Sequence, residues 1–285
     1  SADNLKKLIG YQTPVKSQGH RGTCSIFSAT ALLESLLKIE LGKQLDLSEN
    51  YLEYLVINQV KNYPSEGSDT DYNVTAFKRY GTIPEAVWSY ETEDWKAKDL
   101  SGAEQAKAEN VCGFLEGLRK EGCLITHMDP DNDKFERDAA AFLKEYRTDT
   151  LEYAVLSTDE EIKGQLRRNE PVVLGVDFFY RAWNHRLMTQ YGLGKRDQQA
   201  WDNGVVSTPD KEDIQISKRH PAGHSIVLVG FDDRKRVYYF KNSWGTSGFG
   251  VRSDFLGKDS TPGYGSITYD YAHNHGTVHN VYFRD

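Results

Sequence analysis

Residues 17–40 read SQGHRGTCSIFSATALLESLLKIE and join a glycine-containing loop to a long apolar segment. Apolar side chains after Cys24 recur every three or four residues as far as Ile39, which is the period of a helix that packs on several sides. Gly42 is the expected end of this helix. The pattern therefore predicts a buried helix that begins at Cys24, one of only three cysteines in the chain.

The place of Cys24 at a helix start suits a nucleophile. A cysteine attacks as its thiolate, and the dipole and unpaired amides of a helix N-terminus stabilise that anion. Gln18 lies upstream, and Gly19 and Gly22 allow the loop between them to fold back. The side-chain amide of Gln18 and the backbone amide of Cys24 are therefore candidates for an oxyanion hole.

Helical patterns fill the first part of the chain and strand patterns the last. Helices are expected at residues 47–60, behind a serine cap, and at residues 72–80, while residues 91–147 are charge-rich and helix-prone. From residue 171 onward, PVVLGVDFF, HSIVLVGFD, RVYYFKNSW and GYGSITYDY are typical of strands, and DDRK at 232–235 of a hairpin turn. This order predicts an α+β fold, with a mainly antiparallel second half and a cleft between two lobes.

Length and charge narrow the class of protein. The chain has 285 residues, of which 38% are hydrophobic, so it is long enough for a sizeable core. Its net charge of −7 is spread without a basic stripe, which argues against nucleic acid as a partner. The apolar runs are far shorter than the ~20 residues of a membrane helix. We expect one domain over residues 1–285 that is a monomer and has no membrane span.

Two further residues supply what a cysteine nucleophile needs. His224 stands at the start of a buried strand pattern and is a candidate base. Asn242 follows another strand pattern, where its side-chain oxygen can orient the imidazole. Trp244 is then placed to cover that hydrogen bond from water.

Four motifs together resemble the papain-like cysteine peptidases. QGHRGTCSIFS, GHSIVLVGFD, KNSWG and GYGSI are similar to the family patterns QGxCGSCWAFS, xHAVxxVGY, KNSWG and GYxxI. YNVTAFKRYGTIPEAVWSYET and EPVVLGVDFF also resemble family segments. The resemblance implies a helical lobe at about residues 17–165 and an antiparallel, β-barrel-like lobe at 166–285, with the active-site cleft between them. Insertions are expected near residues 91–160 and 181–203.

The resemblance implies a role for each matching residue. Cys24 is the nucleophile, His224 the base and acid, and Asn242 the residue that orients His224. Gln18 is the oxyanion donor, and Trp244 is the shielding indole. The implied activity is hydrolysis of peptide bonds through an acyl-enzyme thioester, from a thiolate–imidazolium ion pair and without metal or organic cofactor. The residues expected to line the substrate site are Gly67, Ser68, Gly175, Phe178, Ser225 and Trp244.

Some positions depart from the family patterns. Arg21 stands where the family usually has a cysteine, so a common disulfide beside the active-site loop is missing. Ser25 stands where an aromatic residue usually follows the nucleophile. Cys112 and Cys123 are the two cysteines that would form a disulfide, although three thiols are the alternative. Residues 181–203 either overhang the cleft or pack on the back of a lobe.

Other functions and partners follow from the same residues. The same nucleophile serves an acyl or peptide transferase, in which an amine replaces water, and the same fold serves a non-catalytic peptide-binding module. The histidines of HNHGTVH at 273–279 suggest a metal site, but a solvated β-hairpin loop is favoured. The start of the chain resembles a mature N-terminus, which predicts an inhibitory propeptide upstream. We expect peptide or protein substrates and a secreted, periplasmic or lysosome-like location.

Overall fold

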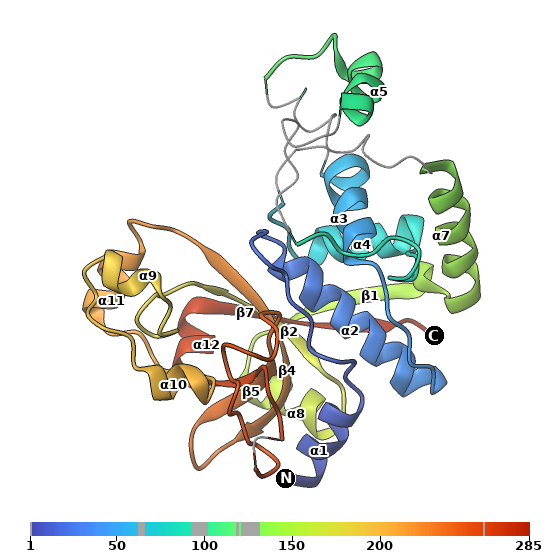
Figure 1. The fold of residues 1–285 in the computed structure, drawn as a ribbon. Helices are drawn as coiled ribbons and strands as arrows, with labels where there is room; N and C mark the ends of the chain where they lie inside the picture. The colour runs from blue at the N-terminus through green and yellow to red at the C-terminus, as the bar shows by residue number, and fades with distance from the viewer. Residues whose placement is uncertain (1, 62–65, 93–101, 118–119, 121–131, 259) are drawn as a thin grey trace. The chain divides into compact units, whose positions relative to one another are not determined.

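The computed structural model describes residues 2–61, 66–92, 102–117, 120, 132–258 and 260–285. The chain forms two compact units, and each is built from separate stretches of sequence (Figure 1). Unit 1 comprises residues 1–17, 31–44 and 154–281, and unit 2 comprises residues 18–30, 45–153 and 282–285. The expected single domain with a lobe boundary near residue 165 stays a prediction.

Unit 2 is mainly helical. Its elements are the start of α2 (Cys24–Leu41), then α3 (Glu49–Leu55), η1 (Val56–Val60), α4 (Thr70–Tyr80), α5 (Gly102–Cys112), α7 (Asn132–Tyr146) and η3 (Thr148–Thr150). Helix α2 begins at Cys24, as predicted, and ends before Gly42, where φ is 66°. Ser48 caps α3 by accepting from the Tyr51 amide, and Gly81, with φ of 76°, ends α4.

Unit 1 is built on an open sheet of seven strands in the order β1-β7-β2-β4-β5-β6-β3. The strands are β1 (Leu151–Leu156), β2 (Val172–Asp177), β3 (Val205–Val206), β4 (Gly223–Asp232), β5 (Val237–Lys241), β6 (Tyr264–Thr268) and β7 (Gly276–Phe283). Pairing is antiparallel from β7 through β6, whereas the short edge strand β3 pairs parallel with β6. Because β1 and β3 are separate edges, the sheet is not the closed, barrel-like form that the resemblance implies.

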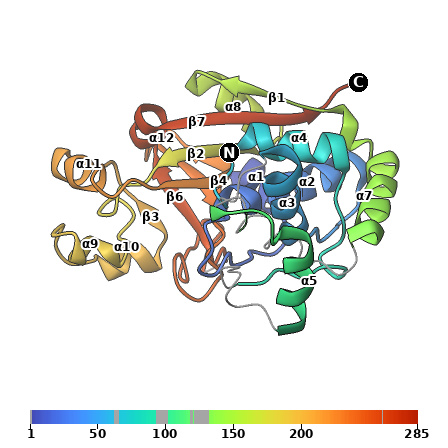
Figure 2. The ribbon, with the colours of Figure 1, turned by 90° about the horizontal axis from the view of Figure 1, so that it is seen from above.

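The predicted hairpin is confirmed, but two other expectations for this half are wrong. Strands β4 and β5 pair around residues 233–236. Strand β6 ends at Thr268, whose hydroxyl accepts from the Tyr271 amide and starts α12 (Tyr269–His275), so GYGSITYDY is only partly a strand. Residues 273–279 are the end of α12 and the start of β7, which pairs with β2 inside the sheet, and not a hairpin loop (Figure 2).

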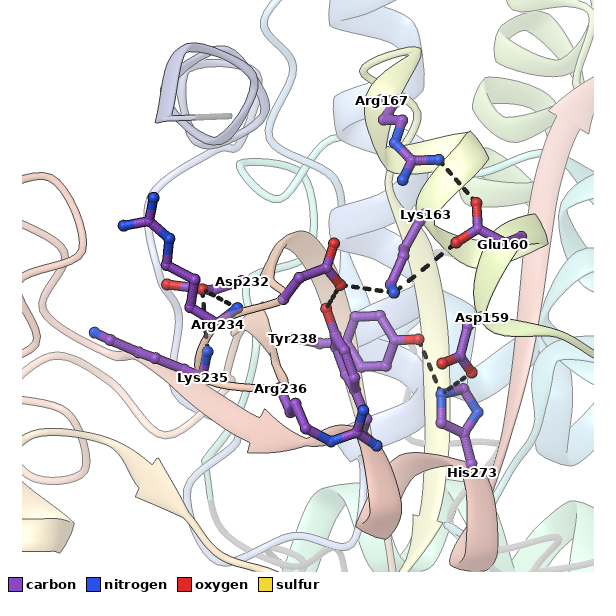
Figure 3. Close-up of polar contacts among 12 residues, drawn as sticks. Asp159, Glu160, Lys163, Arg167, Asp232, Arg234, Lys235, Arg236, Tyr238 and His273 are labelled. Carbon is purple, nitrogen blue, oxygen red and sulfur yellow. Dashed lines mark hydrogen bonds and ion pairs between the residues drawn. The ribbon is translucent and has the colours of Figure 1, made fainter.

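Two helices make polar contacts with the hairpin that β4 and β5 form. Helix α8 (Asp159–Arg167) packs on β4, and its Lys163 Nζ lies 2.7 Å from a carboxylate oxygen of Asp233 in the hairpin turn. His273 Nε2 on α12 lies 2.6 Å from Asp159 Oδ1 and 3.0 Å from the hydroxyl of Tyr238 on β5 (Figure 3). These contacts fix the strands that carry the candidate base and its orienting residue.

Residues 181–203 belong to a group of short helices in unit 1. Helices α9 (Leu187–Gln190), α10 (Gln198–Asp202) and α11 (Lys211–Ser217) gather at one end of the sheet in both views (Figures 1 and 2). Arg181 anchors the segment because its guanidinium lies 2.7 Å from Asp210 and 2.6 Å from Glu212. No helix in the described ranges is both long enough and apolar enough to cross a bilayer.

Candidate active site

The loop before Cys24 folds back through a glycine. Gly19 has φ of 60°, and a Cβ at this position would lie 2.5 Å from the carbonyl oxygen of Thr92. The His20 amide donates to that same carbonyl at 3.1 Å. Only glycine fits so close to another backbone in this conformation. Cys24 follows this loop as the first residue of α2. Its side chain is half-buried and outside any disulfide.

Gln18 is held against the same loop. Its side chain is 8% exposed, and its Nε2 donates to the Arg21 carbonyl at 2.9 Å. The Gln18 carbonyl accepts from the Tyr90 hydroxyl at 2.7 Å. Burial raises the pKa of Tyr90 to about 12, so this hydroxyl keeps its proton at neutral pH. Unit 2 therefore brings Gln18 and Cys24 together on one hydrogen-bonded loop.

The position after Cys24 carries a buried serine. Ser25 is 9% exposed, and its carbonyl accepts from Asn73 Nδ2 of α4 at 3.1 Å. Asn73 is itself buried, so this contact ties the first turn of α2 to α4 inside the helical unit. Ser25 is thus part of the packing where the family usually has an aromatic ring.

His224 and Asn242 form a hydrogen-bonded pair in unit 1. His224 is the second residue of β4, Asn242 directly follows β5, and His224 Nε2 lies 2.8 Å from Asn242 Oδ1. The same oxygen accepts from the Ser243 backbone amide at 2.9 Å. Because a backbone N–H can only donate, the Asn242 atom facing His224 must be the oxygen. His224 therefore carries its hydrogen on Nε2, and Nδ1 is the basic atom of the neutral ring.

Trp244 packs against His224, and its role as a shielding indole stays a prediction. Its ring stacks on the His224 ring, with centroids 4.6 Å apart and planes at 28°. His224 is only 5% exposed. Burial lowers the pKa of His224 to about 4, the hydrogen bond that its Nε2 donates to Asn242 acts in the opposite direction, and nearby His185 adds to the lowering. Burial thus favours the neutral form of the imidazole.

Residues 181–203 contribute two indoles to the surroundings of His224. Trp183 is fully buried, and its ring meets His224 edge-on with centroids 5.1 Å apart. Trp201 stacks on Trp244, the indole that itself stacks on His224, and the centroids of the two indoles are 5.8 Å apart. The sequence left open whether residues 181–203 overhang a cleft or pack on a lobe, and it did not indicate that these two indoles lie around His224 and Trp244. An overhang of the cleft by residues 181–203 stays a prediction.

The residues expected to line the substrate site lie in two places. In unit 2, Gly67 accepts through its carbonyl from Lys61 Nζ, and the Ser68 hydroxyl lies 2.6 Å from Asn73 Oδ1. In unit 1, Gly175 of β2 stands opposite Ser225 of β4. Phe178 follows β2 and is 8% exposed among aromatic rings that include His224 and Trp244, which leaves little of its surface for a ligand. The substrate roles of these residues and of Trp244 stay predictions.

The remaining predictions from the sequence concern a metal site, a disulfide and the pairing of Cys24 with His224. Within the described residues, no three His, Cys, Asp or Glu side chains come together as metal ligands would. Cys112 is buried and disulfide-bonded, while Cys123, the partner that the sequence favours, lies outside the described residues. The pairing of Cys24 with His224 across the two units also stays a prediction.

Known proteins match both the sequence and the fold. The chain is 42% identical to cathepsin K of Gallus gallus over 241 residues, which are 83% of this chain and 53% of the relative. It is 24% identical to pro-cathepsin H of Bos taurus over 257 residues, which cover 88% of this chain and 57% of the relative. The chain thus spans about half the length of these curated relatives.

Solved structures also resemble the fold of this chain. The crystal structure of xylellain, a cysteine protease from Xylella fastidiosa, superposes with a TM-score of 0.61 at 17% identity and covers 96% of this chain and 84% of its own. At that identity the likeness shows the fold. The sequence model of the papain family of cysteine proteases matches residues 3–252. The chain belongs to the papain family of cysteine proteases.

Proposed function

We propose that this protein is a cysteine peptidase that hydrolyses peptide bonds with Cys24 as nucleophile. The observation that carries the proposal is the pair of His224 and Asn242, in which one fixed hydrogen bond leaves Nδ1 as the basic atom of a buried ring. Cys24 at the first position of α2 supplies a thiol where the helix dipole favours its anion. Membership of the papain family supports the same chemistry.

The proposed reaction proceeds through a thioester. His224 Nδ1 takes the Cys24 thiol proton as sulfur bonds to the substrate carbonyl carbon, and the resulting oxyanion accepts from Gln18 and the Cys24 amide. When the C–N bond breaks, His224 returns the proton to the leaving amine. Water then attacks the thioester, His224 takes its proton, and the thiol leaves with that proton restored.

The charge state of His224 refines this proposal. The resemblance implies a resting ion pair, but burial lowers the pKa of His224 to about 4 and favours the neutral ring. We therefore propose that burial opposes the charged ring, and that the imidazolium forms as the proton of Cys24 is transferred to His224. At that moment the hydrogen bond from Nε2 to Asn242 becomes charge-assisted and stabilises the imidazolium.

The substrate, compartment and maturation are part of the same proposal. Peptides or proteins are the substrates, and Gly67, Ser68, Gly175, Phe178 and Ser225 line their site. The disulfide at Cys112 suits an oxidising environment, which supports a secreted, periplasmic or lysosome-like location. One relative is named pro-cathepsin H, a precursor name that supports an inhibitory propeptide for this protein as well.

A peptide assay with one variant tests the proposal. The wild-type protein should release the fluorophore from a set of fluorogenic peptides, and Cys24→Ala should abolish release while its circular dichroism stays unchanged. Product analysis with an added amine distinguishes hydrolysis from acyl transfer, because transfer yields an amide in place of the acid. Wild-type turnover by Cys24→Ala would contradict the assignment.

A further inference from the structure

A partly buried ion pair contacts the loop that precedes Cys24. Arg21 is 1% exposed, and its Nε lies 2.6 Å from Glu66 Oε1. The other oxygen of Glu66 accepts from the Gly22 backbone amide at 3.2 Å. One carboxylate therefore binds both a guanidinium and the main chain, two residues before Cys24. This is the position where the family usually has a cysteine and its disulfide.

The guanidinium also ties other segments of unit 2 to this loop. Arg21 Nη1 donates to Asn50 Oδ1 of α3 at 2.9 Å and to the Glu91 carbonyl at 3.0 Å. The Arg21 Cζ atom lies 4.9 Å from the centre of the Tyr90 ring. A planar guanidinium can serve all these partners at once because its donors point in fixed, separate directions.

A second acid, Glu53, lies close enough to interact with the charges of both Arg21 and Glu66. Glu53 of α3 is fully buried, and burial raises the pKa of its carboxyl well above the ordinary value, with the nearby carboxylate of Glu66 adding to the rise. Burial thus favours the neutral form of Glu53. Glu66 is the carboxylate that contacts the buried guanidinium.

We propose that Arg21 and Glu66 are positioning residues that hold Gln18 and Cys24 in place, in the role that a disulfide usually has beside this loop. The link to Gln18 is direct, since its side-chain amide donates to the Arg21 carbonyl at 2.9 Å. Glu66 also immediately precedes Gly67, so the pair joins the nucleophile loop to a segment proposed to bind substrate. The inference rests on the proposed function, because the groups that are positioned are its nucleophile and oxyanion donor.

The ion pair of Arg21 and Glu66 differs from a disulfide in its reaction with thiols. A thiol reductant that keeps Cys24 reduced also opens accessible disulfides by exchange. An ion pair contains no bond that thiols attack. The contact between Arg21 and Glu66 therefore does not depend on thiol–disulfide exchange.

The test compares three variants of the full chain. Glu66→Gln keeps the shape of the side chain but presents an amide NH2 group to one of its two donors, and Arg21→Lys keeps the charge but lacks the planar set of donors. Glu136→Gln is the matched control, because Glu136 is exposed on α7 of the same unit. The measurements are kcat and KM on a fluorogenic peptide, and amide hydrogen exchange of the peptide covering residues 18–24.

We expect Glu66→Gln and Arg21→Lys to lower kcat about tenfold to a hundredfold, because small displacements of reacting groups cost rates of this order. KM should change much less. Exchange of residues 18–24 should quicken about threefold to tenfold, as expected for the loss of one hydrogen bond. Glu136→Gln should match the wild type in all three measurements.

Two results would overturn the inference. One is wild-type kcat with wild-type exchange in both variants, and the other is an effect confined to KM, which would make Glu66 a substrate-binding residue only. Failure of the proposed function is distinguishable, since an inactive wild type would still show the change in exchange. If Arg21→Lys does not fold, Glu66→Gln alone decides the outcome.

Discussion

Asn242→Ala removes the group that fixes the His224 ring while the nucleophile and the base remain. Asn242 Oδ1 lies 2.8 Å from His224 Nε2, and both side chains are almost fully buried. In the variant, either ring nitrogen can carry the hydrogen, and the imidazolium formed during attack loses its acceptor. The rate should fall, although less than in a variant that lacks Cys24.

The size of the fall follows from this one hydrogen bond. A neutral hydrogen bond contributes about 1 kcal/mol and one to a charged group about 1.5–3 kcal/mol. The bond thus favours the imidazolium over the neutral ring by about 0.5–2 kcal/mol, which corresponds to about 2- to 30-fold in rate. Stability should change less, because Asn242 Nδ2 is a buried donor with no hydrogen-bond partner among the described residues, and the variant removes it.

The assay measures kcat/KM on a fluorogenic peptide together with thermal unfolding. Asn274→Ala, at an exposed position of α12 in the same unit, is the matched control and should match the wild type. A kcat/KM of Asn242→Ala within twofold of the wild type would refute the reasoning. So would a loss of activity that the unfolded fraction fully explains.

Three further predictions concern the same residues. Trp244→Ala should expose the His224 ring and raise its pKa from about 4 toward 6.5. The acid limb of the pH profile of kcat/KM should then move up by about one unit. An unmoved limb would contradict burial as the cause of the lowered pKa. Gln18→Ala should lower kcat about 10²- to 10³-fold with little change in KM, whereas a change in KM alone would mean that Gln18 only binds substrate. The pKa of His224 is lower in the folded protein than in the unfolded chain, so the unfolded chain takes up the proton first as the pH falls. The free energy of unfolding should therefore fall by about 3 kcal/mol as the pH is lowered from 6.5 to 4. Urea unfolding across this range should show a smaller fall for His224→Gln, and equal falls would refute the role of His224.

The local part of the structure could be predicted from the sequence. The helix from Cys24 and its end before Gly42 follow from apolar spacing and from a glycine at positive φ. The hairpin around residues 233–236 follows from turn residues between two β-branched and aromatic runs. These features depend on neighbours in the chain, and a single sequence contains that information.

Long-range contacts could not be predicted in the same way. The ion pair of Arg21 with Glu66 joins positions that are 45 residues apart, and nothing in either local pattern indicates the other. Helix α12 was missed because its aromatic residues suggest a strand, while the Thr268 cap and the packing of the sheet favour a helix. The lowered pKa of His224 likewise depends on burial under Trp244 and beside Trp183, which only the fold provides.

The most direct test of the account is to find which residue a thiol-directed peptide epoxide modifies. We predict that mass spectrometry of the inactivated protein shows one adduct, on Cys24, and that activity falls in proportion to its formation. Cys24→Ala should take up no inhibitor at all. An adduct on another residue, or full activity after complete modification of Cys24, would contradict the claim that Cys24 is the nucleophile.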